Sequence, residues 1–211
     1  LFSKKGHLSH EMMLNTASMQ LSLDYSSLEQ AEFLAFLSDS IHPFFSIIFS
    51  NSPFWHSKKS YKKNVRELIW SQTDSDRCNS LFEHGITNNK KLIENYIDFL
   101  LKVPAIFRES SNSISNFNGT IEKYLIELHE NNGINNEKIK TVLRQIFTNV
   151  RFKDILEIRG ADTPPFGYEL APISFLKGLF RNKKSLDRLF ELCKNWGKKD
   201  RLSLICLSRD L

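Results

Sequence analysis

The chain has 211 residues, of which 41% are hydrophobic and 25% charged, and this composition predicts a packed core in one compact domain or two very small ones. Its longest apolar runs fall well short of the ~18 residues that span a membrane. The three cysteines form no C-x-x-C pair, which argues against a disulfide scaffold or a structural zinc site.

Positive charge is in modest excess, with a formal net charge of +5. The lysines gather in short runs, namely Lys58, Lys59, Lys62 and Lys63, then Lys183 and Lys184, then Lys198 and Lys199. Such runs next to aromatic residues can bind phosphate, but acidic residues are spread along the whole chain. We therefore expect a solvated surface and no nucleic-acid partner, and we keep an anion-binding module as an alternative.

The chain begins with Leu1 rather than methionine, and no signal-like apolar segment follows it. We expect from this a piece of something longer. Separately, we expect a cytoplasmic protein with no membrane partner.

The clearest local pattern is a strict alternation from Ala17 to Tyr25, which predicts a half-buried strand. One face of this strand is apolar, and the other carries Ser18, Gln20 and Ser22. The polar face must meet water, a ligand or a metal, and Gln20 is its candidate oxygen ligand.

Most of the remaining chain is predicted to be helical. Ser27 has the residue type of a helix N-cap, and Pro43 that of the first turn of a second, short helix. Residues 51–79 are predicted to form a long loop, and residues 110–119 a mobile loop. Further helices are expected to begin near these residues: Asn89, Thr120, Asn136, Ala171 or Pro172, and Ser185.

A second strand is predicted from Phe152 to Arg159, broken at Gly160. Alternation places Glu157 and Arg159 side by side on one face. A carboxylate there can bind Mg²⁺ and an arginine can bind a phosphate, although a plain salt bridge explains the same pair. The predicted fold class is α+β, with antiparallel strands and many helices.

A third candidate region runs from Arg66 to Arg77 and holds two arginines, two aspartates and Trp70. This mixture suits an amino-acid carboxylate or a nucleotide, but an ordinary polar loop has the same composition.

Four ordered blocks together resemble a known family. Residues 150–162 read V-R-F-K-D-I-L-E-I-R-G-A-D, which resembles the V-R-L-K-x-Y-L-E-M-R-G-A-D signature of glutamate–cysteine ligases of the plant and proteobacterial type. Residues 12–24 are similar to that family's M-M-x-R-T-C-T-V-Q-V-N-L-D, residues 49–54 to F-A-N-S-P-F, and residues 66–77 to R-S-H-I-W-T-D-T-D-K-D-R.

The resemblance implies a glutamine synthetase-like carboxylate–amine ligase fold. Residues 1–211 would be the C-terminal portion of one catalytic domain whose N-terminal half is absent. It also implies the reaction: ATP phosphorylates the γ-carboxylate of glutamate, and the amine of cysteine attacks to give γ-glutamylcysteine, the first step of glutathione biosynthesis. The implied substrates are glutamate, cysteine and ATP, and the implied cofactor is Mg²⁺.

The resemblance also implies roles for individual residues. Glu157 would be a Mg²⁺ ligand, with Gln20 at or beside the metal site. Arg159 would bind the ATP phosphates, and Arg66 would pair with a substrate carboxylate, helped by the loop from Trp70 to Arg77.

The chain departs from the family pattern after the second strand. Residues 163–170 read T-P-P-F-G-Y-E-L where the family has G-G-P-W-R-R-L-C. This difference leaves open a related ligase with another amine acceptor. A non-catalytic remnant that binds anionic partners through its lysine runs is a further alternative.

Overall fold

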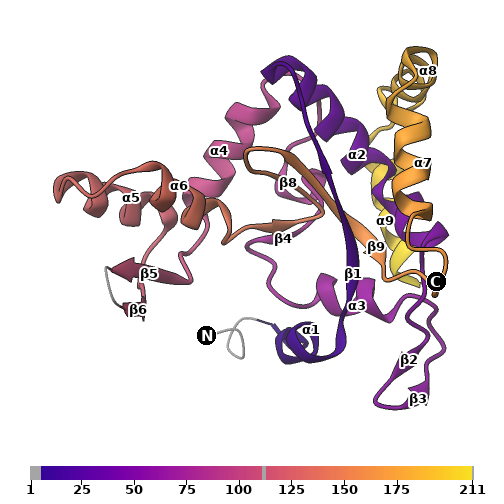
Figure 1. The fold of residues 1–211 in the computed structure, drawn as a ribbon, viewed down its shortest axis with the longest axis horizontal. Helices are drawn as coiled ribbons and strands as arrows, with labels where there is room; N and C mark the ends of the chain where they lie inside the picture. Colours follow the sequence, from indigo (N-terminus) through magenta and orange to yellow (C-terminus); the bar gives the residue numbers. More distant parts are fainter. Residues whose placement is uncertain (1–5, 111–112, 211) are drawn as a thin grey trace.

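The computed structural model describes residues 6–110 and 113–210, and its central element is a three-stranded antiparallel sheet. The strands lie in the order β1 (Ser18–Leu23), β9 (Leu156–Asp162), β8 (Val150–Phe152). Helix α2 (Leu28–Ile48) packs against one face of this sheet, and Figure 1 shows it behind the strands. The expected α+β class with antiparallel strands is confirmed at this level.

The strand predicted around residues 17–25 is confirmed, and its alternation is visible in its burial. Leu21 is buried between the exposed Gln20 and Ser22. In the pairing with β9, Leu21 lies opposite Ile158 and Ser22 opposite Glu157, with a register shift between Met19 and Leu21. The polar side chains of β1 and β9 therefore share the face of the sheet that points away from α2, called the front face below.

The second predicted strand is wrong in extent, because it is two strands joined by a tight turn. β8 ends at Phe152 and β9 begins at Leu156, and the amide of Lys153 donates to the carbonyl of Ile155 across the turn, 2.9 Å away. The expected break at Gly160 is also wrong, since β9 continues to Asp162. A Cβ on Gly160 would collide with the imidazole of His42 on α2, so glycine here allows close packing of strand and helix.

The expected second helix starting at Pro43 is wrong as well. α2 runs through Pro43 without interruption, and buried residues lie on both sides of it, among them Leu37, Ile41 and Phe45. Burial of this continuous apolar surface outweighs the backbone hydrogen bond that proline removes. The predicted cap is confirmed, since the amide of Gln30 donates to Ser27 Oγ at 3.2 Å.

The short apolar runs predicted no membrane-spanning segment, but α2 has the length and hydropathy of one. However, 72% of its most apolar window is buried inside the protein. This is the position of a core helix.

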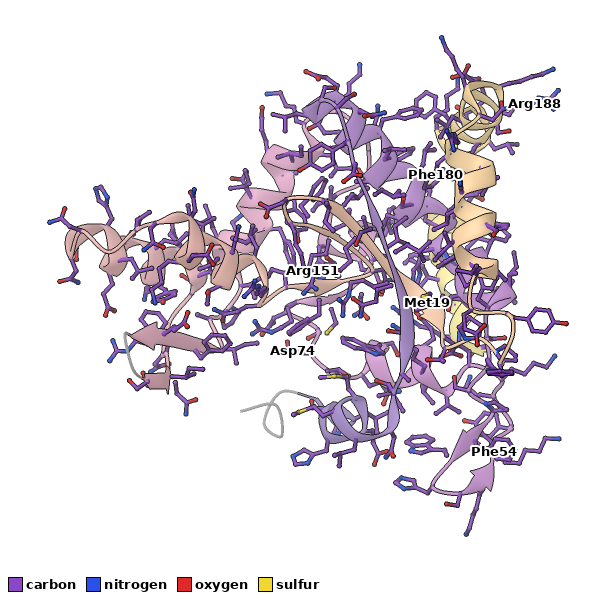
Figure 2. The ribbon with its side chains drawn as sticks, viewed as in Figure 1. Met19, Phe54, Asp74, Arg151, Phe180 and Arg188 are labelled. Carbon is purple, nitrogen blue, oxygen red and sulfur yellow. The ribbon has the colours of Figure 1, made fainter. Side chains whose placement is uncertain are left out.

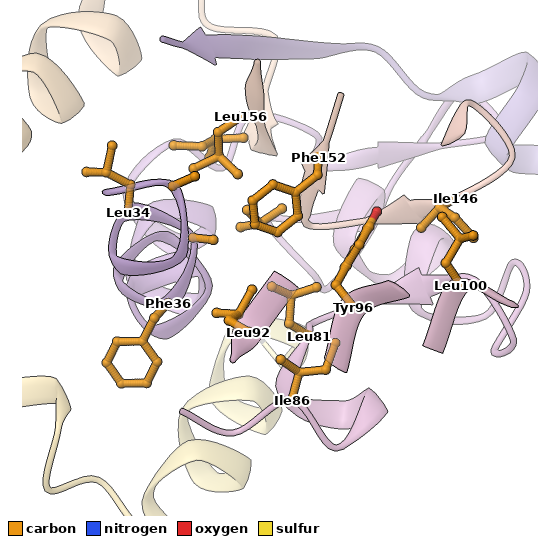
Figure 3. Packing of buried hydrophobic residues seen from close by; sticks show 14 of the residues in the cluster. Leu34, Phe36, Leu81, Ile86, Leu92, Tyr96, Leu100, Ile146, Phe152 and Leu156 are labelled. Carbon is orange, nitrogen blue, oxygen red and sulfur yellow. The ribbon is translucent and has the colours of Figure 1, made fainter. Parts of the chain in front are cut away.

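The face of the sheet that packs on α2 is called the back face below. The hydrophobic core lies between α2, this back face and α4 (Leu92–Lys102) (Figure 3). α4 contributes Leu92, Tyr96 and Leu100, which recur every four residues and so share one face of the helix. Phe152 of β8 meets the Tyr96 ring edge-on with centroids 5.0 Å apart, which joins α4 to the sheet.

The polar stretch 51–79 contains more structure than the predicted loop. It forms a hairpin of β2 (Phe54–Trp55) and β3 (Lys58–Lys59), followed by α3 (Val65–Ser71) and β4 (Cys78–Asn79). α3 begins at an N-cap, Asn64, which accepts a hydrogen bond from the amide of Glu67. The predicted mobile loop 110–119 overlaps a hairpin of β5 (Phe107–Ser110) and β6 (Ser113–Asn116), and residues 111–112 lie outside the described residues.

The remaining elements complete the chain. They are α1 (Ser9–Asn15), the short helix η2 (Phe82–His84), α5 (Ile121–Glu130), α6 (Asn136–Leu143), β7 (Phe147–Thr148), α7 (Ala171–Phe180), α8 (Lys183–Cys193) and α9 (Lys198–Asp210). The helices expected at Thr120, Asn136 and Ala171 are confirmed. The cap expected at Ser185 is instead Asn182, and α9 was not predicted.

Candidate functional site

The front face of the sheet carries a compact group of polar side chains, called the front-face cluster: Gln20, Arg151, Lys153, Glu157 and Arg159. The guanidinium of Arg159 donates from Nη1 to Glu157 Oε2 at 2.9 Å and to Gln20 Oε1 at 3.0 Å. The structure thus brings together three of the residues that the sequence singled out.

Glu157 sits at the centre of this cluster among three cations. Its Oε2 accepts from Arg151 and Arg159, and its Oε1 accepts from Lys153 Nζ at 2.6 Å. Burial by itself would raise the pKa of Glu157, but the hydrogen bonds from Lys153 and Arg159 and the charge of Arg151 outweigh it and lower the pKa to about 2. Glu157 is therefore deprotonated and negatively charged at neutral pH.

Arg66 reaches the same region from the first turn of α3. Its Nη2 donates to the backbone carbonyl of Arg159 at 2.6 Å. The start of α3 is tied to the end of β9 through Ser52, whose Oγ donates to Asp162 Oδ2 and accepts from the amide of Arg66. These two hydrogen bonds connect residues 49–54 to residues 150–162, and they fix the position of Arg66.

Trp70, one turn further along α3, provides an aromatic surface for both arginines. Its ring lies 5.7 Å from the guanidinium carbon of Arg66 and 5.4 Å from that of Arg159. Phe147 of β7 meets the Trp70 ring edge-on, 6.2 Å away. Within the described residues, Trp70 Nε1 and Arg66 Nε are buried without a hydrogen-bond partner. These two N–H groups are therefore free to donate to a ligand.

Arg77 does not join this group. Its guanidinium is fully buried and donates to Asp74, to the carbonyl of Gln145 and to the carbonyl of Pro104, at distances of 2.7 to 3.1 Å. These bonds fasten the loop after α3 to the rest of the fold. The expected substrate contact by Arg77 is not available in this arrangement, because its donors face protein carbonyls and Asp74.

The front-face cluster suits an anion better than a magnesium ion. Mg²⁺ requires several oxygen ligands, and here one carboxylate and the amide oxygen of Gln20 already accept hydrogen bonds from cations. Across residues 6–110 and 113–210, no three metal-binding side chains lie together. The residues present do not fit Mg²⁺ by themselves.

Two members of the cluster were missed or undervalued from sequence. Arg151 lies opposite Glu157 only because β8 folds back on β9 as a hairpin. Lys153 shares the predicted face of Glu157, so alternation could have identified it. Phe147 is remote in sequence, and no local pattern indicated its contact with Trp70.

The segment that departs from the family pattern lies at the end of β9 and is largely open to solvent. Phe166 is 97% exposed, and Tyr168 and Leu170 are also exposed. A cavity of about 310 Å³ lies beneath, lined by Ile48, Tyr168 and neighbouring residues. Asn51 Nδ2 anchors the segment through the carbonyl of Thr163 at 2.9 Å.

Comparison with known proteins identifies the family of the chain. The model of the glutamate-cysteine ligase family 2 (GCS2) matches residues 1–206. The chain belongs to this family. Among curated relatives it is similar to the chloroplastic glutamate–cysteine ligase of Arabidopsis thaliana (32% identity over 209 residues) and to that of Medicago truncatula (31% over 209 residues).

Each of these matches covers 94% of the chain but only 38% and 39% of the relative, so the chain spans about two-fifths of the length of these ligases. The chloroplastic glutamate–cysteine ligase B of Oryza sativa subsp. japonica is matched in the same way, with 30% identity and 40% of its length covered. All three relatives are named as chloroplastic proteins, which contradicts the expected cytoplasmic location.

Proposed function

We propose that the chain takes part in the ATP-dependent joining of glutamate to cysteine, as one wall of an active site completed by residues outside these 211. The observation that carries the proposal is the meeting of Arg159 and Arg66 at the Trp70 ring, where Arg159 also donates to Glu157, a carboxylate with a lowered pKa. Family membership and the names of the relatives support the same reaction.

The chemistry of this reaction requires positive charge at fixed positions. ATP phosphorylates the γ-carboxylate of glutamate, and the cysteine amine then displaces phosphate from the acyl phosphate. Negative charge builds up on phosphoryl oxygens as the phosphoryl group moves, and preorganised donors stabilise it. In the proposal, Arg159 binds phosphate oxygens, Arg66 binds a substrate carboxylate, and Trp70 keeps both guanidinium groups in place.

Glu157 has a positioning role in this proposal. Its carboxylate lies between Arg151, Lys153 and Arg159, so it offsets their mutual repulsion and orients them. Binding of Mg²⁺ by Glu157 and Gln20 stays a prediction. It requires Glu157 to exchange hydrogen bonds from its cations for the metal, and further carboxylates from outside the chain.

The proposal is tested with the polypeptide that carries these residues, by measuring γ-glutamylcysteine formed from glutamate, cysteine and ATP. Arg159→Lys keeps the charge but loses the planar pair of donors, so we expect kcat/KM to fall about 100-fold. Arg188→Lys is the matched control, since Arg188 is exposed on α8 far from the sheet (Figure 2). Equal activity of the two variants would remove Arg159 from the site.

A second candidate is a related ligase with another amine acceptor, and the altered segment 163–170 favours it. Gly167 and Tyr168 stand where the family pattern has two arginines, and the exposed Phe166 stands where it has tryptophan, close to the end of β9. A panel of amino acids tested for ATP-dependent phosphate release separates the two candidates, because clear preference for cysteine excludes the second. Binding of ATP with no turnover of any amine identifies an inactive remnant.

A further inference from the structure

A buried histidine of α2 lies directly behind the end of β9. His42 is 2% exposed, and the edge of its imidazole that carries Nε2 fills the space where a Cβ on Gly160 would be. A polar ring in such a place costs free energy unless it makes hydrogen bonds. His42 belongs neither to the hydrophobic core nor to the front-face cluster, so its contacts indicate what it does.

One ring nitrogen of His42 is held by Asn149, the residue just before β8. Asn149 Nδ2 lies 3.2 Å from His42 Nδ1. An amide nitrogen can only donate, so Nδ1 is the acceptor and the ring proton lies on Nε2. Nε2 has no hydrogen-bond partner in the part of the chain that the structure describes, and Glu67 Oε2 is 4.0 Å away from it. The contact with Asn149 therefore orients the ring.

The charge state of the ring agrees with this role as an acceptor. Burial lowers the pKa of His42, with smaller contributions in the same direction from Arg66 of α3 and Arg209 of α9. The carboxylates of Glu67 on α3 and Asp39 on α2 raise this pKa, but by less than burial lowers it. His42 is therefore neutral at neutral pH, and a neutral ring keeps Nδ1 available to accept.

Asn149 connects the imidazole to the backbone of Arg159. The carbonyl of Asn149 accepts a hydrogen bond from the amide of Arg159 at 2.9 Å. The carbonyl of Arg159 accepts in turn from Arg66 Nη2. Both backbone polar groups of Arg159 are thus held by residues outside β1 and β9, and its side chain leaves the strand from a fixed point.

We infer that His42 is a positioning residue for Arg159. From behind the sheet it holds the side chain of Asn149, so that the Asn149 carbonyl stays opposite the Arg159 amide. The Arg159 guanidinium then projects from the front face at the place where it meets Glu157. The effect of His42 on catalysis rests on the proposed function. The chain of hydrogen bonds does not, and it is tested separately.

The first test observes the ring of His42 in the 211-residue chain by nitrogen-15 NMR at neutral pH. We expect a neutral imidazole with its proton on Nε2. Asn149→Asp replaces the donor by an acceptor of nearly the same shape, so we expect a proton on Nδ1 in this variant. A proton on Nδ1 in the unaltered chain, or a ring that does not respond to Asn149→Asp, would overturn the inference.

The second test separates the ring nitrogen of His42 from the volume of the side chain. Leucine and asparagine have nearly the same shape, but His42→Asn keeps an oxygen that can accept from Asn149. Amide hydrogen exchange at Arg159 should be about tenfold faster in His42→Leu, the value of one good hydrogen bond. His42→Asn should recover most of the protection. The amides of α4 verify that both variants fold, because a general loss of stability would speed their exchange too.

Equal exchange at Arg159 in the two variants would show that His42 acts through packing alone, and would overturn the inference. Where the proposed function holds, the polypeptide with a complete active site should follow the same order, with kcat/KM for ATP about tenfold lower in His42→Leu than in His42→Asn. Equal values in an active polypeptide would remove the positioning role. An unaltered polypeptide that forms no γ-glutamylcysteine would count against the proposed function alone, and the exchange at Arg159 would still decide whether His42 holds it.

Discussion

Strand β9 has two faces that are buried almost equally and are held by different forces. On the back, Leu156 and Ile158 are 0% and 2% exposed and pack into the core beneath α2. On the front, Glu157 and Arg159 are each 6% exposed and belong to the front-face cluster. Back-face contacts depend on shape and volume, whereas front-face contacts depend on charge. One face therefore maintains the fold by close packing, and the other holds a set of charged side chains in fixed positions.

The largest expected effect is on the back face. Leu156→Ala removes a fully buried side chain and leaves a cavity, so we expect the free energy of unfolding to fall by about 2 to 5 kcal/mol. Urea denaturation at neutral pH measures the change. The loss should not vary between pH 6 and pH 3, because no charge is altered. A loss below about 1 kcal/mol would mean that the back face is less tightly packed than its burial indicates.

The front face should instead respond to pH. The pKa of Glu157 is lowered from its ordinary value of 4.5 to about 2, so its ion pairs stabilise the fold above pH 4.5 and lose that effect as the pH falls towards 2. Glu157→Gln should therefore destabilise the protein at pH 6, and its difference from the unaltered chain should shrink by about 2 kcal/mol by pH 3.

Urea denaturation of both proteins at several pH values measures this difference. Ionisation of the other side chains contributes equally to both proteins and cancels. A difference that stays constant with pH would show that Glu157 acts through packing, like the residues on the back face.

The contrast between the faces was partly predictable from sequence. Period-two alternation correctly placed Glu157 beside Arg159 and Gln20 on a polar face, because side chains of a strand must alternate. The pairing of Arg151 with Glu157 was not predictable, since the turn at Lys153 lacks the glycine or asparagine that usually indicates a hairpin.

Tertiary packing decided the other differences. Pro43 has the local signal of a helix start, yet apolar residues on both sides of it are buried along one continuous helix. The approach of Arg66 to Arg159 depends on the link from Asp162 to Ser52, which joins residues 110 positions apart. No local pattern contains such a link, so only the resemblance to the family blocks predicted that Arg66 belongs to the site.

A pair of glycines isolates shape from charge, and one of them gives the smallest expected effect. A Cβ at Gly160 would collide with the His42 ring of α2, so Gly160→Ala should force the strand and helix apart and cost about 1 to 3 kcal/mol. Gly178 in the interior of α7 has open space around its Cβ position. Gly178→Ala should therefore stabilise the protein, by up to about 1 kcal/mol, through its better helix propensity.

Thermal unfolding of both variants measures the opposite signs. If Gly160→Ala were neutral, β9 would have room to move away from α2. The front-face cluster could then shift with the strand, and the two faces would no longer be independent. If it destabilises as expected, the back face fixes the position of β9, and the charged side chains are presented from a rigid strand.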